Sequence, residues 1–389
     1  MIPRGPRPVL ALVLGMLLVS ETALSPFYPA LFRELFGIED LDATGTYLWV
    51  CRLAGVIALP LWGLAARRWP LWRLVATGLG AAIALNLALA AAPSFALFTA
   101  VSALLVACGA AILLAYPALV GLDERDGDRL PGVVAFAALF HAALTVSTAL
   151  GAGVLALPEP RLGIAAFSLL DAAMLVLVLR VLPRAPAPAP APAGERRARR
   201  GLVLLAGVAA VAVLFELAAA AVRPFYVELA QAEGASLAGG AALFMLASAA
   251  ALAVLPLARP LRRRLGAALL PTSLAVSAAG LLLQAVAPDL TTMTGARILF
   301  GAGLGLGQVA LDLRMFAVVG TTGPGFAAVE TARAGALLAA PVLAAATASA
   351  SLALPLVAGA ALLAVAAAVS PLLCPSPLTK EPRDLRFSR

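Results

Sequence analysis

PRAPAPAPAPAGERRARR, residues 183–200, divides this 389-residue chain into two strongly apolar halves. Alternating proline disfavours a helix and favours an extended polyproline conformation, so this segment is predicted to be a semi-stiff linker. Its terminal arginines are expected to lie against anionic lipid headgroups as a solvated tether, and a signalling role is the alternative. The predicted organisation is a domain of residues 1–182, the linker 183–200, a domain of residues 201–376 and a tail of residues 377–389.

The composition of the chain is that of a membrane protein. Apolar residues make up 62% of it and charged residues 12%, which leaves too little polar surface for a dissolved protein. Apolar stretches of about 20 residues recur, and each is long enough to cross a hydrocarbon core of ~30 Å. Backbone groups in lipid must bond internally, so these stretches are predicted to be helices. Low aromatic content and abundant Ala and Leu disfavour the alternating strands of a β-barrel.

The predicted fold class is an all-α integral membrane protein with twelve transmembrane helices, arranged as two pseudo-symmetric bundles of six. The first 20 residues also have features of a secretory signal, but their apolar character runs on to Phe32. The spans are predicted near residues 9–31, 45–66, 71–92, 94–118, 132–156, 162–182, 202–224, 236–258, 266–287, 290–313, 325–348 and 352–373.

The basic residues indicate a topology. The formal net charge of +8 raises the possibility of nucleic-acid binding, but the arginines cluster in short segments between apolar runs. With the amino terminus inside, the external connections hold only Arg33, Arg161 and Arg223, and the other connections hold nearly all the rest. The positive-inside rule then places both termini in the cytoplasm, and the expected location is the inner membrane of a bacterium. No nucleic-acid partner is expected.

Short motifs recur in the two halves at a slowly drifting offset. Pro-Phe-Tyr ends the first span at Pro26 and the seventh at Pro224. Ala-x-Ala-Pro closes the third span and the ninth, and Pro-Gly opens the fifth and the eleventh. This order predicts an internal duplication of six helices, the construction from which many transporters are built, with the solute held between the repeats.

The connection between the second and third spans reads Gly63-Leu-Ala-Ala-Arg67-Arg68-Trp-Pro70-Leu-Trp-Arg73. It resembles the motif Gly-x-x-x-Asp-Arg-x-Gly-x-Arg-Arg of the major facilitator superfamily. The predicted six plus six helices, basic central linker and cytoplasmic termini also resemble this family, and this resemblance of architecture extends over nearly the whole chain. Gly63, Arg68 and Arg73 match the motif. Arg67 replaces the aspartate that in this family helps to latch the two halves, and Pro70 replaces the second glycine.

The family's exporters carry a Gly-rich pattern with Gly-Pro on the fifth helix, where this chain has only Gly151-Ala-Gly153. The family's fourth-helix pattern Arg-x-x-x-Gly-x-Gly stands here on the tenth span, at Arg297 to Gly303. The resemblance implies a monomeric secondary active transporter, coupled to protons, that works by alternating access. Export of a small organic molecule of the metabolite, drug or siderophore class is expected, since no sugar or peptide importer signature is present.

Ionisable side chains within a span cost ~2.5–3.5 kcal/mol each on insertion scales, so each is a candidate for function. The substrate and proton-coupling candidates on the helices are Glu21, Arg52, Glu216 and Arg297. In the family's fold, helices 1, 4, 7 and 10 surround the central cavity, and the resemblance therefore implies that Glu21, Glu216 and Arg297 lie toward the solute. A fixed structural ion pair is the alternative for each, and it is the preferred interpretation for Arg52. On the functional interpretation, Glu21→Gln and Arg297→Ala leave expression intact and lower transport.

Other polar residues in the spans have two interpretations each. His141, the single histidine, is a candidate proton relay or a polar packing residue. Asp171 has no evident partner in the sequence. The gate candidates are Asp312, Arg314, Glu330 and Arg333; of these, Glu330 and Arg333 are three residues apart and meet on one helix face.

Enzymatic function is not predicted, because the chain has one histidine, no HExxH and no Gly-x-Ser-x-Gly motif. The three scattered cysteines make no metal spacing, and no metal or cofactor is expected. The glycines of residues 301–307 are interpreted as a surface for close helix packing, not as a nucleotide-binding loop. The alternative function is a transport-inactive sensor or assembly factor on a transporter scaffold.

Overall fold

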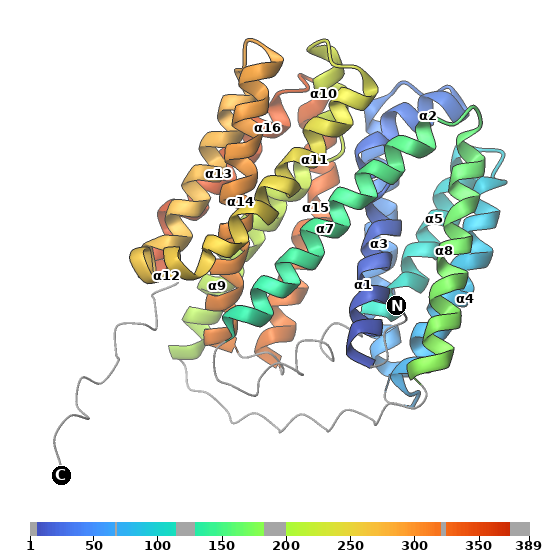
Figure 1. Ribbon diagram of the computed structural model, residues 1–389, viewed down its shortest axis with the longest axis horizontal. Helices are drawn as coiled ribbons and strands as arrows, with labels where there is room; N and C mark the ends of the chain where they lie inside the picture. Colours follow the sequence, from blue (N-terminus) through green and yellow to red (C-terminus); the bar gives the residue numbers. More distant parts are fainter. Residues whose placement is uncertain (1–5, 67, 114–128, 183–199, 320–323, 374–389) are drawn as a thin grey trace.

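The computed structural model describes residues 6–66, 68–113, 129–182, 200–319 and 324–373, and every regular element in these ranges is a helix (Figure 1). Eleven candidate membrane spans occur among them. One of the eleven, Leu237–Ala285, is 49 residues long and contains two long helices with a short one between them. The chain is therefore a multi-pass helical membrane protein, as its composition predicted.

The helices before the linker are α1 (Pro6–Thr22), the 3-10 turn η1 (Ser25–Phe27), α2 (Tyr28–Phe36), α3 (Leu41–Ala65), α4 (Leu71–Ala90), α5 (Phe95–Leu113), α7 (Leu130–Leu155) and α8 (Pro160–Val181). After it come α9 (Arg200–Ala221), α10 (Tyr226–Ala232), α11 (Leu237–Val254), η4 (Leu255–Leu257), α12 (Ala258–Leu265), η5 (Gly266–Ala268), α13 (Leu269–Ala285), α14 (Leu290–Val319), α15 (Pro324–Ala348) and α16 (Leu354–Leu373). These bounds agree with the predicted spans to within a few residues at most ends.

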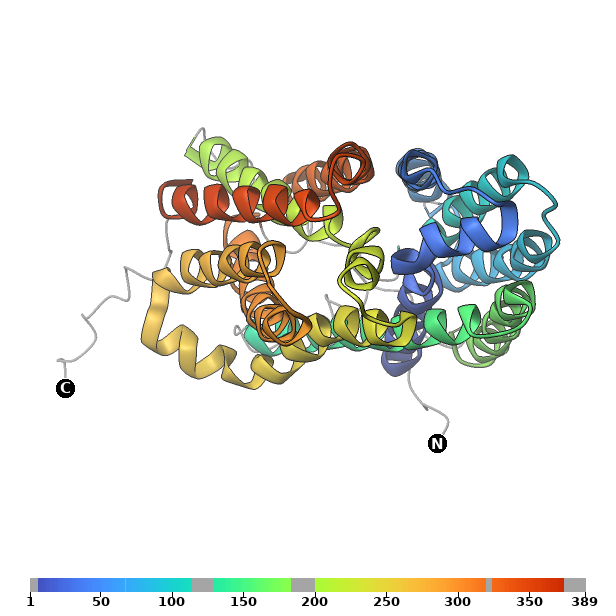
Figure 2. The same ribbon diagram turned by 90° about the horizontal axis from the view of Figure 1, so that it is seen from above.

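The two parts of the chain repeat the same packing. Before the linker, α4 packs against α5 and α8, α3 against α5, and α1 against α7. After it, α13 packs against α14 and α16, α11 against α14, and α9 against α15. The parts meet mainly along two helix pairs, α7 with α11 and α3 with α15, and α7 also contacts α14. Seen from above, the two groups of helices lie side by side, and α7 extends from the first group to the second (Figure 2). Each pair joins the second long helix of one part to the fifth of the other.

The repeated Pro-Phe-Tyr motif breaks a helix in the same way in both parts. Phe27 before α2 has φ −117° and ψ 2°, and Phe225 before α10 has φ −114° and ψ 6°. Proline lacks the N–H that would continue the helical ladder, so α1 and α9 each end there and a short helix follows. The first predicted span is thus two helices. The short helices α2 and α10 approach each other, and the Arg33 guanidinium donates to Glu228 Oε2 at 3.2 Å.

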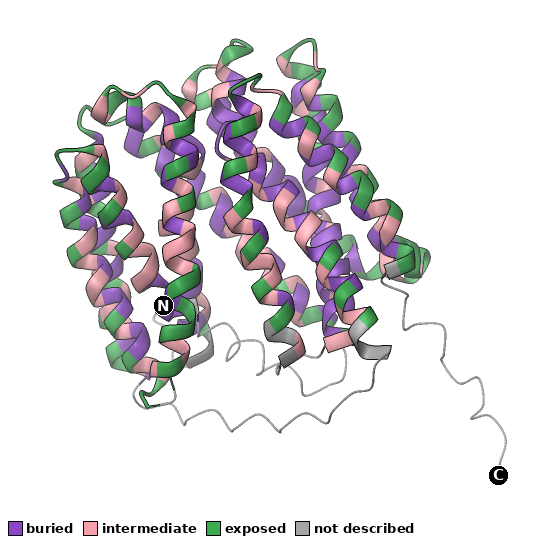
Figure 3. Cartoon of the chain, turned by 180° about the vertical axis from the view of Figure 1, so that it is seen from behind, coloured by how far each residue is buried: buried purple, intermediate pink, exposed green. Residues whose placement is uncertain are grey.

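The exposed residues lie on the outward faces of the long helices, while the buried residues lie between helices (Figure 3). Many of the exposed residues have large apolar side chains. Such a surface is stable in lipid and insoluble in water. The most exposed of these side chains include Leu61, Leu162, Leu169, Val203, Val286 and Leu372.

The longest helix, α14, is at the centre of the second part. It begins at Asp289, whose Oδ1 accepts the Thr292 N–H at 2.8 Å, and this bond holds the pKa of the exposed carboxyl below its usual range. Its glycines then permit close contact with two neighbours, as the sequence predicted. A Cβ on Gly303 would lie 2.5 Å from Ser277 Oγ of α13, and a Cβ on Gly305 would lie 2.9 Å from the Ala251 backbone of α11.

Gly303→Ala is expected to lower the free energy of unfolding by about 1–3 kcal/mol, because the new methyl group would force α13 and α14 apart. The measurement is thermal unfolding of the purified protein in detergent. Gly295→Ala on the same helix is the matched control, since a Cβ there meets nothing within 4 Å. Equal melting temperatures for the two variants would contradict this account of the α13–α14 contact.

Candidate functional site

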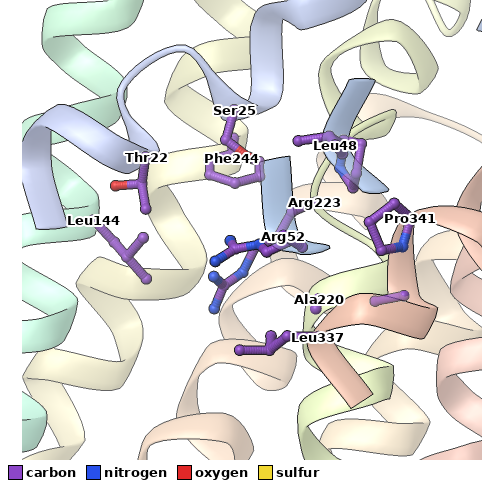
Figure 4. Close-up of a pocket in the computed structure, with 12 residues that line it drawn as sticks. Thr22, Ser25, Leu48, Arg52, Leu144, Ala220, Arg223, Phe244, Leu337 and Pro341 are labelled. Atoms are coloured by element: carbon purple, nitrogen blue, oxygen red, sulfur yellow. The ribbon is translucent and has the colours of Figure 1, made fainter. Parts of the chain in front are cut away.

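A pocket lies where the two parts of the chain meet. The cavity has a volume of about 30 Å³, and the empty space counted together with the open solvent at its mouth is about 500 Å³. The first part contributes residues of α1, η1, α3 and α7 to its wall, and the second contributes α9, the turn after it, α11 and α15 (Figure 4). The lining residues are Thr22, Ser25, Leu48, Arg52, Leu144, Ala220, Arg223, Pro224, Phe244, Leu337, Ala340 and Pro341.

Two arginines give the pocket its charge. Arg52 lies on α3 and Arg223 lies in the turn that ends α9, so each part supplies one guanidinium, and both side chains extend into the pocket (Figure 4). They are close enough to repel each other electrostatically. In the described ranges neither forms an ion pair or a hydrogen bond through its guanidinium; that of Arg223 lies 5.7 Å from the centre of the Phe140 ring.

Sequence reasoning included Arg52 among the candidates but missed Arg223, which it assigned to an external connection. The available signal was the position of Arg223 directly before the repeated Pro224–Tyr226 motif, which marks the break that turns the chain into the pocket wall.

The carboxylate of Glu21 lies away from the pocket wall. It faces α5, where a Cβ on Gly109 would lie 3.3 Å from Glu21 Oε1. Arg52 still attracts it electrostatically, although no bond joins these two described residues. Glu21 therefore lies at the contact of α1 and α5, behind the arginine that lines the pocket.

Arg333 of α15 is the centre of an ionic cluster in the second part. Its Nε donates to Glu216 Oε1 of α9 at 3.0 Å, and its Nη2 donates to the same oxygen. Its Nη1 donates to Glu330 Oε1 at 3.1 Å and to Asp312 Oδ1 of α14 at 3.5 Å. The predicted pair of Glu330 and Arg333 is confirmed, and the cluster joins α9, α14 and α15 around one guanidinium.

The fourth gate candidate, Arg314, bonds to a different set of neighbours. Its guanidinium donates to the carbonyl oxygen of Ser370 at 3.5 Å and to that of Ala267. Residues two apart on a helix face different directions, which explains why Asp312 reaches Arg333 while Arg314 reaches α16 and η5.

Arg297 is almost fully buried in the second part, with 3% of its surface exposed. Its Nε donates to the Leu243 carbonyl at 3.2 Å, and its Nη atoms donate to Gln284 Oε1 and to the Phe244 carbonyl, each at 3.4 Å. The guanidinium carbon lies 3.7 Å from the centre of the Tyr226 ring. These contacts hold α10, α11, α13 and α14 together, which is the structural interpretation of this residue.

His141 is completely buried on α7, at its contact with α14. Neither ring nitrogen has a hydrogen-bond partner in the described part of the chain, and Gln308 of α14 is a polar neighbour. The ring packs edge-on against Phe140, with centroids 5.5 Å apart. Its place at the junction of the two parts is compatible with either sequence interpretation.

Asp171 has a partner that the sequence did not reveal. Asn86 Nδ2 of α4 donates to Asp171 Oδ2 of α8 at 2.8 Å, and both residues are buried. This bond joins two helices of the first part, far from the pocket lining, and is a packing interaction.

The motif-like connection between α3 and α4 lies at an exposed end of the first part. A Cβ on Gly63 would meet nothing within 4 Å, the Arg68 N–H donates to the Ala65 carbonyl at 3.0 Å, and Arg73 is exposed beside the Trp72 ring. Arg67, which stands in place of the family's aspartate, lies outside the described residues.

Comparison with known proteins adds no relative. No protein-family model matches the chain, and a search of curated proteins finds no match either.

Arg297→Ala is expected to lower the free energy of unfolding by about 2–4 kcal/mol, because it removes the donor to the Gln284 amide oxygen and the side-chain bonds to two helical carbonyls, and opens a cavity beside Tyr226. The test is thermal unfolding in detergent, with Arg33→Ala as the control, since that exposed ion pair is worth about 1 kcal/mol or less. An Arg297→Ala variant as stable as the parent protein would restore Arg297 as a candidate for solute contact.

Proposed function

We propose that this chain is a secondary active transporter of the major facilitator type, which exports a small organic molecule by alternating access and is coupled to protons. The observation that carries the proposal is the pocket whose wall both parts of the chain share. A site between two similar parts can be exposed to one side of the membrane and then to the other when the parts rock.

Twelve crossings follow from the eleven candidate spans when the 49-residue stretch is counted as two. Its long helices, α11 with 18 residues and α13 with 17, are each close to the length that crosses a bilayer, and the arginine-rich α12 stands between them. The repeated helix contacts and the matched Pro-Phe-Tyr breaks support two bundles of six. The arginines of α12 favour a cytoplasmic position for that turn.

The cluster around Arg333 is the proposed coupling site. Three carboxylates surround one guanidinium, so the group carries excess negative charge inside the membrane, and protons can neutralise it. Arg333 is one helical turn from the pocket residue Leu337, and Glu216 is one turn from the pocket residue Ala220. A change in the charge of the cluster therefore acts directly on α9 and α15, two of the helices that form the pocket wall.

The ion pair of Arg33 and Glu228 is the proposed outer latch. It joins α2 to α10, and so links the two parts at one end of the helices. With 47% of the Arg33 side chain exposed, the pair is weak enough to open and close during a transport cycle.

Alternating access can be tested without knowing the cargo. In a protein whose native cysteines are replaced by alanine, Leu337→Cys places a thiol in the pocket, and a membrane-impermeant maleimide is applied from each side in turn. Labelling is expected from one side at a time, and adding Arg33→Gln is expected to raise labelling from the outer side several-fold. A lipid-facing control, Leu169→Cys, should stay unlabelled. Simultaneous labelling from both sides, or from neither, would contradict a transporter and favour the sensor alternative.

Proton coupling predicts that labelling of the Leu337→Cys protein depends on pH. Lowering the pH from about 8 to about 5.5 supplies protons to the proposed coupling site and is expected to shift the exposure of the introduced pocket thiol at least ~3-fold. Glu216→Gln should remove most of this shift, because it removes one of the carboxylates that Arg333 bonds. Glu159→Gln, an exposed carboxylate before α8, is the matched control. A pH response that survives Glu216→Gln unchanged would place the coupling elsewhere.

A further inference from the structure

The charge of the pocket is unbalanced. Arg52 and Arg223 enter the same pocket, repel each other, and have no carboxylate within ion-pair distance among the described residues. A guanidinium that faces a pocket inside the bundle is stabilised by a bonded anion, because it has given up part of its hydration. Two such groups side by side, from different parts of the chain, therefore form a site that lacks its counter-charge.

Among the described residues, no nearby carboxylate lies within ion-pair distance of either arginine in this conformation. Glu216 attracts Arg223 electrostatically, but its Oε1 accepts both hydrogen bonds that Arg333 donates to it. Glu21 attracts Arg52 from behind, across the contact of α1 with α5. The remaining polar groups of the pocket wall are the hydroxyls of Thr22 and Ser25, which are neutral.

The rest of the pocket wall is apolar. Leu48 and Leu144 come from the first part, and Phe244 and Leu337 from the second. A ligand that fits this pocket has a compact anionic group for the two guanidinium groups and a hydrocarbon part for these side chains.

We propose that the cargo is an organic oxyanion, with a carboxylate or phosphate group held between Arg52 and Arg223. The inference rests on the proposed transport function and names the substrate class of that same site. Guanidinium groups bind carboxylate and phosphate with paired hydrogen bonds, which fixes the orientation of the ligand as well as its charge. Because the two arginines belong to different parts of the chain, the anion replaces repulsion by attraction across the interface and stabilises one arrangement of the two parts.

The test is the melting temperature of the purified full-length protein in neutral detergent, with citrate, inorganic phosphate or a medium-chain fatty acid added at constant ionic strength, and with chloride as the reference. At least one of these oxyanions is expected to raise the melting temperature of the parent above its value in chloride. Arg52→Gln and Arg223→Gln should each abolish that rise.

Arg73→Gln is the matched control, since it removes one exposed arginine outside the pocket. It should respond to the oxyanions as the parent does. The proposal is overturned if no oxyanion exceeds chloride, or if the pocket variants respond as the parent does. A separate sample receives phosphatidylglycerol. A response to this lipid without a response to the three oxyanions would also overturn the proposal, because the anion would then be a lipid headgroup and not cargo. If oxyanions bind but the introduced pocket thiol shows no alternating exposure, the anion site is supported and the proposed transport function is contradicted.

Discussion

The cost of a charged side chain inside the membrane is the constraint on which the interior of this protein depends. Three arrangements inside the bundle meet this constraint to different degrees. Arg297 is bonded to carbonyls and an amide and packed on an aromatic ring, so its charge is fixed in the core of the second part. Arg333 is surrounded by three carboxylates. Arg52 and Arg223 face a pocket without a bonded partner in the described ranges.

The number of bonded partners distinguishes a charged residue that stabilises the fold from one that can take part in function. A charge with all its partners in place contributes to one conformation and resists change. A cluster with more carboxylates than guanidinium groups can gain or lose a proton. Two cations without a bonded carboxylate can bind or release an anion. Helices α9 and α15 connect the last two, because each carries a residue of the Arg333 cluster and, one turn away, residues of the pocket wall. Proton uptake and anion binding would thus act on the same two helices.

Much of the fold was accessible from sequence because it depends on local properties. Hydrophobic length located the helices, and the paired Pro-Phe-Tyr motifs marked two breaks that have nearly the same backbone angles. The spacing of Glu330 and Arg333 predicted their contact, since three residues on a helix place two side chains on one face. The glycines of α14 were interpreted correctly as packing positions for the same reason.

The sequence by itself determined that the chain is helical, where its helices lie, and which side chains are costly enough to need a partner. Only the tertiary structure decided which partner each one has. It placed Arg297 against helices α11 and α13, gave Asp171 its bond to Asn86, and brought Arg223 into a pocket with Arg52. Helix periodicity fixes the direction of a side chain relative to its own helix, but a contact between helices depends on how each helix is rotated and which neighbour packs against it. Those quantities are set by the interlocking of the whole bundle, and no short stretch of sequence contains them.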